Sequence, residues 1–214
     1  MGEAMRYEGA SKPVTRDVTP APASAHSADQ REAQRFTLLI RAAKLVTRDG
    51  EYLCVIRDAS ESGISMRIFH PIPESPTMTV ELQNGDRYGV ELVWQEEDRA
   101  GFRFNIEADI NRIIESPSRF AKRPVRLNIG AAAEIEAMGR AEHAVFQDIS
   151  QQGAKLACSR SFAIDERVKL RADGMPEIFA KIRWRREGTC GLVFEETFQY
   201  GELARIARRL QRRG

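Results

Sequence analysis

Apolar and polar residues alternate over short stretches of this chain, and turn residues separate one stretch from the next. A period of two is typical of half-buried β-strands. Asp49-Gly50 and Asn84-Gly85 have the sequence of tight hairpin turns. The first half of the pattern predicts six antiparallel strands, which are Thr37 to Thr47, Tyr52 to Arg57, Gly63 to Phe69, Met78 to Leu82, Tyr88 to Gln95 and Gly101 to Ile106.

The second half of the chain repeats this scheme and adds helical segments. A short helix is predicted over Ala108 to Glu115, and a longer one over Tyr200 to Arg212, where apolar residues follow helical spacing. The fold class predicted is mainly β, with two six-stranded antiparallel barrels in tandem, a short linker helix and a C-terminal amphipathic helix packed on a barrel. The second set of strands comprises Leu127 to Glu136, Ala141 to Gln147, Ala154 to Cys158, Arg167 to Arg171, Ile178 to Arg185 and Cys190 to Phe194.

The two halves share one spacing of 90 residues. The sequence D-x-S-x-x-G begins at Asp58 and again at Asp148, and the same offset relates Trp94 to Trp184 and Phe104 to Phe194. A fixed period of this kind indicates a repeated structural unit. We therefore expect the paired Trp and Phe residues to pack in or between the barrels and not to form ligand platforms.

The repeat also predicts the domain boundaries. Residues 1–30 are rich in Ala, Ser, Thr and Pro and hold few large apolar side chains, so we expect a disordered N-terminal tail. Residues 31–116 then form the first domain, and residues 117–214 form the second domain together with the C-terminal helix.

Composition and charge limit where in the cell the protein can be expected and which kinds of partner it can bind. The 214 residues carry a net charge of +2, and they include neither an apolar run of about 20 residues nor the apolar core of a signal peptide. We expect a cytoplasmic protein without a membrane span. The C-terminal helix presents either a solvated basic face or a patch for nucleic acid or membrane, and nucleic acid is disfavoured because no interleaved aromatic residues form a stacking platform. The basic residues in question are Arg205, Arg208, Arg209, Arg212 and Arg213.

The residues that could carry chemistry are few. Cys54, Cys158 and Cys190 are odd in number and lack C-x-x-C spacing, which argues against a disulfide framework and a zinc site. Free cysteines in apolar strands are usually small buried hydrophobes. Ser60 and Ser150 lie in no nucleophile elbow. We therefore expect no enzyme activity, no cofactor and no metal.

One pattern in the first unit carries a family resemblance. Arg31 and Arg35 form R-x-x-x-R before the first strand, and Asp58, Ser60 and Gly63 form D-x-S-x-x-G between two later strands. This combination resembles the PilZ domain, the bacterial receptor module for cyclic diguanylate (c-di-GMP). By itself D-x-S-x-x-G also describes an Asx- or ST-turn, so the pairing with the two arginines carries the resemblance.

The second unit has the whole loop but a less regular basic segment. Asp148, Ser150 and Gly153 complete D-x-S-x-x-G. An offset of 91 aligns the first arginine pair with Lys122 and Arg126, whereas another frame uses Arg119 and Arg123. Both frames stay open, as does the question of which unit binds a ligand.

The resemblance implies a function. Arginine binds phosphate oxygens and guanine edges through a planar fork of donors, whereas lysine supplies only a point charge. The aspartate would accept hydrogen bonds from guanine, and the serine and glycine would complete the barrel wall. The implied function is a c-di-GMP receptor that changes conformation or the binding of a downstream protein partner. The alternative is a degenerate tandem that acts as a protein-interaction module without nucleotide.

Overall fold

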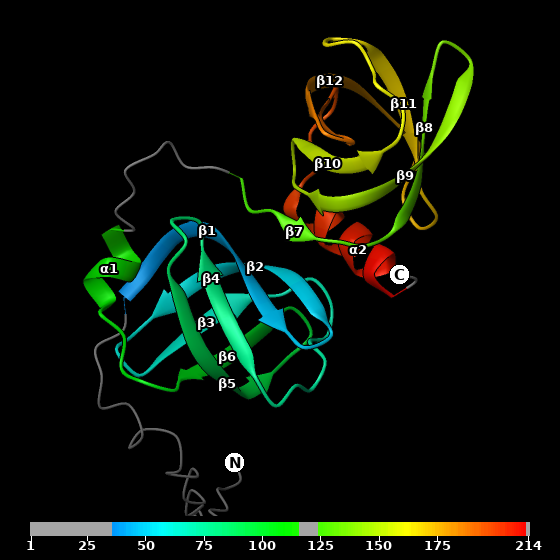
Figure 1. Cartoon of the computed structure of the whole chain (residues 1–214). Helices are drawn as coiled ribbons and strands as arrows, with labels where there is room; N and C mark the ends of the chain where they lie inside the picture. The colour runs from blue at the N-terminus through cyan, green and yellow to red at the C-terminus, as the bar shows by residue number, and fades with distance from the viewer. Residues whose placement is uncertain (1–35, 116–123, 213–214) are drawn as a thin grey trace, which may run out of the picture. The chain divides into compact units, whose positions relative to one another are not determined.

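The computed structural model describes residues 36–115 and 124–212, and all of them belong to one compact unit, Ala33–Gly214. The first barrel closes in the order β1-β2-β3-β6-β5-β4, because β1 pairs with both β2 and β4 (Figure 1). Gly85 has φ +90° at the β4–β5 turn, as its Asn-Gly sequence predicts. Its strands are β1 (Phe36–Thr47), β2 (Gly50–Ala59), β3 (Gly63–Arg67), β4 (Met78–Leu82), β5 (Arg87–Gln95) and β6 (Arg99–Phe104).

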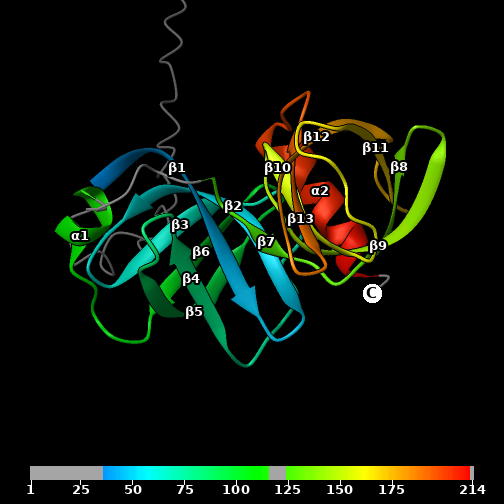
Figure 2. The same cartoon turned by 45° about the horizontal axis from the view of Figure 1, so that its top comes forward.

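The second barrel has the same antiparallel topology. Its sheet order is β10-β13-β12-β11-β8-β9-β7, and the pairing of β9 with β10 closes it (Figure 2). The predicted fold class is confirmed, with two closed barrels of six long strands each. The strands are β7 (Leu127–Asn128), β8 (Ala132–Ala137), β9 (Arg140–Ile149), β10 (Gly153–Cys158), β11 (Arg167–Arg171), β12 (Ile178–Arg186) and β13 (Thr189–Phe194).

The single strand predicted over Leu127 to Glu136 is wrong, because an irregular segment divides it into β7 and β8. Both pieces pair with β9, and Ile129 and Ala131 bond to β9 across the break. Burial still alternates through the break, with Ile129 and Ala131 inside and Gly130 outside. The alternation of buried and exposed residues therefore continues where the regular strand pairing is interrupted. For this reason the sequence pattern cannot reveal the break.

The helices lie close to the predicted positions. Helix α1 (Ile110–Glu115) begins two residues later than expected, where the Asp109 side chain accepts hydrogen bonds from the backbone N–H groups of Asn111 and Arg112. Helix α2 (Tyr200–Gln211) buries the predicted apolar face, which consists of Leu203, Ala204, Ile206, Ala207 and Leu210. No helix in residues 36–115 and 124–212 is long and apolar enough to cross a membrane.

Two hydrophobic cores organise the described residues. The first lies inside the first barrel, and the second joins the inside of the second barrel to α2 and to Ala42 and Leu53 of the first barrel. Helix α2 therefore packs against β2 as well as against its own barrel. Glu51 in β2 strengthens this junction, because its backbone exchanges hydrogen bonds with the Gln211 side chain and its carboxylate accepts bonds from Asn128 at 2.7 and 2.9 Å.

The repeated aromatic residues divide into two groups. Phe104 and Phe194 are 6% and 5% exposed, which confirms that they pack in the cores. The same expectation is wrong for Trp94 and Trp184, which are 41% and 38% exposed. Each indole instead covers a glycine on the neighbouring strand, where an added Cβ would lie 2.1 Å from the indole nitrogen.

Candidate functional site

The two D-x-S-x-x-G sequences form the same tight turn, once between β2 and β3 and once between β9 and β10. In the first, the Ser60 N–H donates to the Gly63 carbonyl at 2.8 Å, and the Gly63 N–H donates to Ser60 Oγ at 3.2 Å. In the second, the Ser150 N–H donates to the Gly153 carbonyl at the same distance of 2.8 Å. Both serines are buried, so their hydroxyls serve the turn itself.

The glycine of each turn is required by packing. A Cβ on Gly63 would lie 2.6 Å from the Phe102 carbonyl oxygen, and a Cβ on Gly153 would lie 2.1 Å from that of Leu192. Neither glycine has a positive φ. The close approach of the next strand explains the residue, because only glycine leaves room for it.

The aspartates of the two turns have different partners. Asp58 accepts a short hydrogen bond from the Ser65 hydroxyl on β3, directly across the β2–β3 ladder. Asp148 instead accepts a charge-assisted bond of 2.9 Å from Arg126 Nη1, with 53% of the arginine side chain and 16% of the aspartate side chain exposed. Arg126 and the loop of the second unit therefore meet in this structure.

Strand register distinguishes the two frames for the basic segment. In β1, Thr37 lies opposite Asp58, and in β7, Asn128 lies opposite Asp148. The residues before these strands therefore correspond at an offset of 91, and the position equivalent to 35 is 126. The break between β7 and β8 restores the offset of 90, because Ala42 lies opposite Val55 and Ala132 lies opposite Val145. The register favours the frame of Lys122 and Arg126.

The structure brings together part of the predicted site. Asp58, Ser60 and Gly63 share the first turn, and Arg126 joins Asp148 at the second. Five candidate site residues lie outside the described residues, namely Arg31, Arg35, Arg119, Lys122 and Arg123. Ser65, the partner of Asp58, was not predicted, although its place two residues after Gly63 puts it opposite the aspartate.

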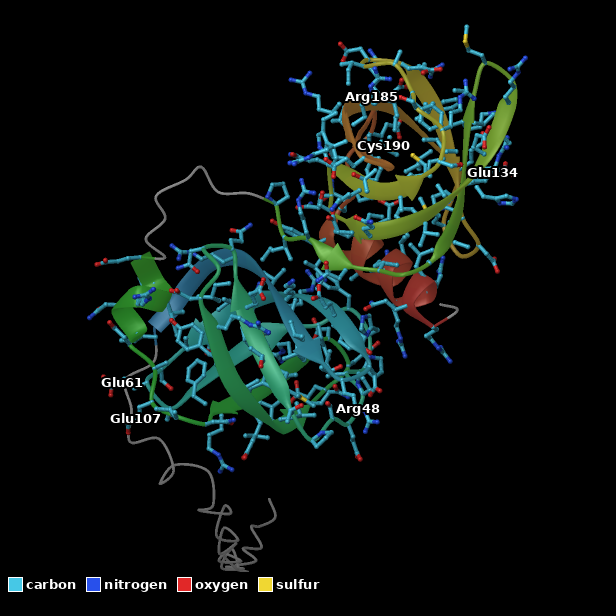
Figure 3. The ribbon with its side chains drawn as sticks, viewed as in Figure 1. Arg48, Glu61, Glu107, Glu134, Arg185 and Cys190 are labelled. Atoms are coloured by element: carbon cyan, nitrogen blue, oxygen red, sulfur yellow. The ribbon has the colours of Figure 1, made fainter. Side chains whose placement is uncertain are left out.

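The acidic residues near the two turns occupy different positions. Glu61, inside the first turn, and Glu107 are both exposed (Figure 3), and the neighbouring Ala108 N–H donates to the Glu61 carbonyl at 2.9 Å. The equivalent residues of the second unit are Gln151 and Thr197, which are neutral. The second unit has its own acidic pair, Glu195 and Glu196, where the first has Asn105 and Ile106. Only the first unit, however, has a negative charge between the aspartate and the glycine of the loop, at Glu61.

The described residues offer little else for chemistry. Burial raises the pKa of the Cys54 and Cys190 thiols to about 12, so both stay protonated and unreactive at neutral pH. All three cysteines are free and buried, which confirms the prediction of small core residues. Within residues 36–115 and 124–212, no three His, Cys, Asp or Glu side chains form a group that could hold a metal ion.

Comparison with known families decides the identity of the fold. The PilZ domain matches twice, over residues 29–116 and 117–211. The chain belongs to the PilZ domain family. Two PilZ domains in tandem account for both barrels, both turns and the C-terminal helix. No curated protein matches the chain.

Several solved structures resemble the chain at low similarity. The Borreliella burgdorferi PlzA protein in complex with c-di-GMP is 11% identical, with 78% of this chain and 87% of that chain covered and a TM-score of 0.33. The Bacillus subtilis inhibitor of motility (MotI/DgrA) is 13% identical, with 83% and 97% covered and a TM-score of 0.34. Escherichia coli YcgR in complex with c-di-GMP is 11% identical, with 80% and 81% covered and a TM-score of 0.28. With scores this low, none of these likenesses supports an inference about the ligand of this chain.

Proposed function

We propose that this tandem PilZ protein is a c-di-GMP receptor without catalytic activity, and that ligand binding changes its conformation or its contacts with a downstream protein partner. One observation carries the proposal most directly. Arg126 and Asp148 come from separate parts of the sequence and form an ion pair at 2.9 Å, at the point where both would face a ligand held at the second turn. Membership of the PilZ family supports the same function.

The chemistry of the pair suits a guanine dinucleotide. Arg126 is half exposed and presents a guanidinium that can bind a phosphate in bidentate fashion or stack on a base. Asp148 can then accept hydrogen bonds from the N–H groups of guanine. Ser150 and Gly153 hold the turn in shape, and we assign the equivalent roles to Asp58, Ser60 and Gly63 in the first unit. Arg31 and Arg35 would close the first site, and Lys122 and Arg126 the second.

The inter-barrel junction supplies a route to an output. Arg126 lies two residues before Asn128, whose N–H and side-chain amide both bond to Glu51 of the first barrel. A ligand that moves Arg126 away from Asp148 therefore pulls on a segment that is tied to the other barrel. The size of such a change is limited by the difference in ligand affinity between the two conformations.

Calorimetric titration of the full chain with c-di-GMP tests the proposal. We expect binding in the wild type, and a loss of about tenfold or more at one site in Arg35→Ala and at the other in Arg126→Ala, since each removes a charge-assisted hydrogen bond. Arg140→Ala, at the exposed first residue of β9, is the matched control and should bind as the wild type does.

Each result has a clear consequence. Loss of all binding in Arg126→Ala, with unchanged affinity in Arg35→Ala, assigns the ligand to the second unit alone. Absence of any binding heat in the wild type, confirmed by unchanged thermal stability with saturating ligand, contradicts the proposal and favours the protein-interaction module.

A further inference from the structure

A cavity of about 320 Å³ lies in the second barrel, at the opposite end of β10 from the D-x-S-x-x-G turn. It is formed by the segment that follows β10 and by the β12–β13 hairpin, where Figure 3 labels Arg185 and Cys190. Three arginines line it, together with three hydroxyl groups and one carboxylate, Glu187. The residues are Arg160, Arg185, Arg186, Ser159, Ser161 and Thr189.

The arginines are held in different ways. Arg185 Nη1 donates to Ser161 Oγ and to the Phe162 carbonyl, both at 2.7 Å, which fixes its guanidinium against the loop. Arg186 is 81% exposed, and its only ion-pair contact among the described residues is with Glu187 at 3.7 Å. At least one cation of the cavity is therefore available to a ligand.

Arg160 is the least satisfied of the three. Its Nη2 lies 3.9 Å from Glu166 and its guanidinium lies over the Phe162 ring, but its buried Nη1 has no hydrogen-bond partner among the described residues. A buried donor without a partner lowers stability. An acceptor that reaches the cavity and draws the guanidinium toward it would remove this defect.

The first barrel provides an internal control, because every cavity residue has an equivalent 90 positions earlier. The hydrogen bond from Cys158 N–H to the Gly188 carbonyl recurs between Ile68 and Asp98 at the same 2.9 Å. The net charge of the equivalent residues is reversed, however. The first hairpin carries Glu96, Glu97 and Asp98, and Arg185 is replaced by Gln95, whose side chain bonds to the Ile72 N–H at 2.8 Å.

We propose that this cavity binds a small phosphate monoester. A phosphate monoester is a tetrahedral dianion with three terminal oxygens, so three guanidinium groups and neighbouring hydroxyls can surround it. A planar carboxylate has only two oxygens and would leave some of these donors without a partner. A volume of about 320 Å³ holds a phosphate with a body of a few carbon atoms. The site does not depend on c-di-GMP binding, because it lies at the other end of β10 and uses none of the residues of the PilZ motif.

Amide chemical shifts of the isotope-labelled full chain provide the test, with glycerol 3-phosphate and inorganic phosphate as probes and glycerol as the uncharged control at constant ionic strength. We expect saturable shifts at 159–162 and 185–190 and none at the equivalent positions 69–72 and 95–100. Arg186→Gln removes an exposed cation and should weaken binding about tenfold. Glu187→Gln removes the competing carboxylate and should strengthen it.

Arg183→Gln is the matched control, because it removes an exposed arginine from the same strand but outside the cavity. It should change the affinity by less than about twofold. Equal losses in Arg183→Gln and Arg186→Gln would mean only a diffuse attraction and would overturn the proposal. So would shifts that vanish when c-di-GMP is saturating, since the probes would then occupy the PilZ site. Binding of a phosphoserine peptide without binding of glycerol 3-phosphate would assign the cavity to a protein partner instead.

Discussion

The two barrels of this chain share strand order and, apart from the start of the first strand, register, but they differ in charge at both ends. At the hairpin end, the first barrel has Glu96, Glu97 and Asp98 where the second has Arg186, Glu187 and Gly188. Their backbones make the same hydrogen bond at this place. The comparison shows that the fold specifies the position of the hairpin and leaves its charge free to vary, so one duplicated architecture can carry two different surfaces.

The barrels also differ at the end that carries the D-x-S-x-x-G turn, here called the motif end. There the basic segment favours one unit and the charge within the turn favours the other. By sequence the first unit has the better basic segment, with two arginines, but Glu61 and Glu107 flank its turn. The second unit has a lysine in place of one arginine and carries Glu195 and Glu196 before Thr197, but its loop residue Gln151 is neutral and Arg126 already contacts Asp148. A complete motif therefore does not by itself make the first site the stronger one.

The largest expected effect is on stability, and it should separate the buried phenylalanines from the more exposed tryptophans. Phe104→Ala and Phe194→Ala should each lower the free energy of unfolding by about 3–5 kcal/mol, because each empties space in a core. Trp184→Ala should lower it by only about 1 kcal/mol, since the indole is more than a third exposed. Urea unfolding followed by circular dichroism measures both, and equal losses in Trp184→Ala and Phe194→Ala would contradict the assignment.

The next effect compares the two turn glycines. Gly153→Ala should destabilise the second barrel by about 1–3 kcal/mol, because the new Cβ meets a backbone carbonyl that can move only with its strand. Gly63→Ala should have a smaller effect, since its Cβ would lie at 2.6 Å and not at 2.1 Å. Gly130→Ala is the control, with no atom within 4 Å, and should change the stability by less than about 0.5 kcal/mol. A Gly153→Ala protein as stable as Gly130→Ala would show that the strand can yield.

Much of the fold could be predicted because apolar runs end at turn residues and burial alternates cleanly along strands such as β4 and β11. The ranges Met78–Leu82 and Arg167–Arg171 were predicted to the residue. The strand break before Ala132 could not be predicted, because burial alternates through Gly130 although the ladder does not. The tryptophans were misjudged for a related reason. Their repeat indicated a packing role, but their partners are Gly101 and Gly191 on the next strand, and only the register shift before each tryptophan brings the indole over the glycine.

The site was predictable only where short-range sequence determines it. The turn at Ser150 to Gly153 follows from local hydrogen bonds, and the sequence indicates it directly. The choice between Arg123 and Arg126 depends on which residue lies opposite Asp148, which is a matter of register. The cavity beside Arg160 joins two segments from different parts of the second unit, so no local pattern signals it.

A smaller effect concerns His70, the first-barrel equivalent of Arg160. Burial lowers the pKa of His70, and the charge of Arg208 adds to this. The folded protein therefore binds this proton less readily than the unfolded chain, so stability is greatest above about pH 6.5 and declines as the pH falls through the lowered pKa. We expect a loss smaller than about 1 kcal/mol between pH 7.5 and pH 5, absent in His70→Gln and retained in His143→Gln, a control at an exposed position. Identical pH profiles of unfolding for all three proteins would contradict this.

The smallest expected effect tests whether charges beside the two turns change ligand affinity. This prediction depends on the proposed function. Glu61→Gln removes one negative charge beside the first turn, so binding of c-di-GMP to the first unit should become tighter by about twofold, as expected for a charge that is screened by water. Thr197→Glu, at the exposed equivalent of Glu107, should weaken binding at the second unit by a similar factor. Calorimetry at low salt measures both, and the two changes should shrink together as salt is added, because screening acts equally on each. Unchanged affinities at low salt, in proteins that still bind the ligand, would mean that the flanking charges play no part and that the arginine segments alone distinguish the two sites.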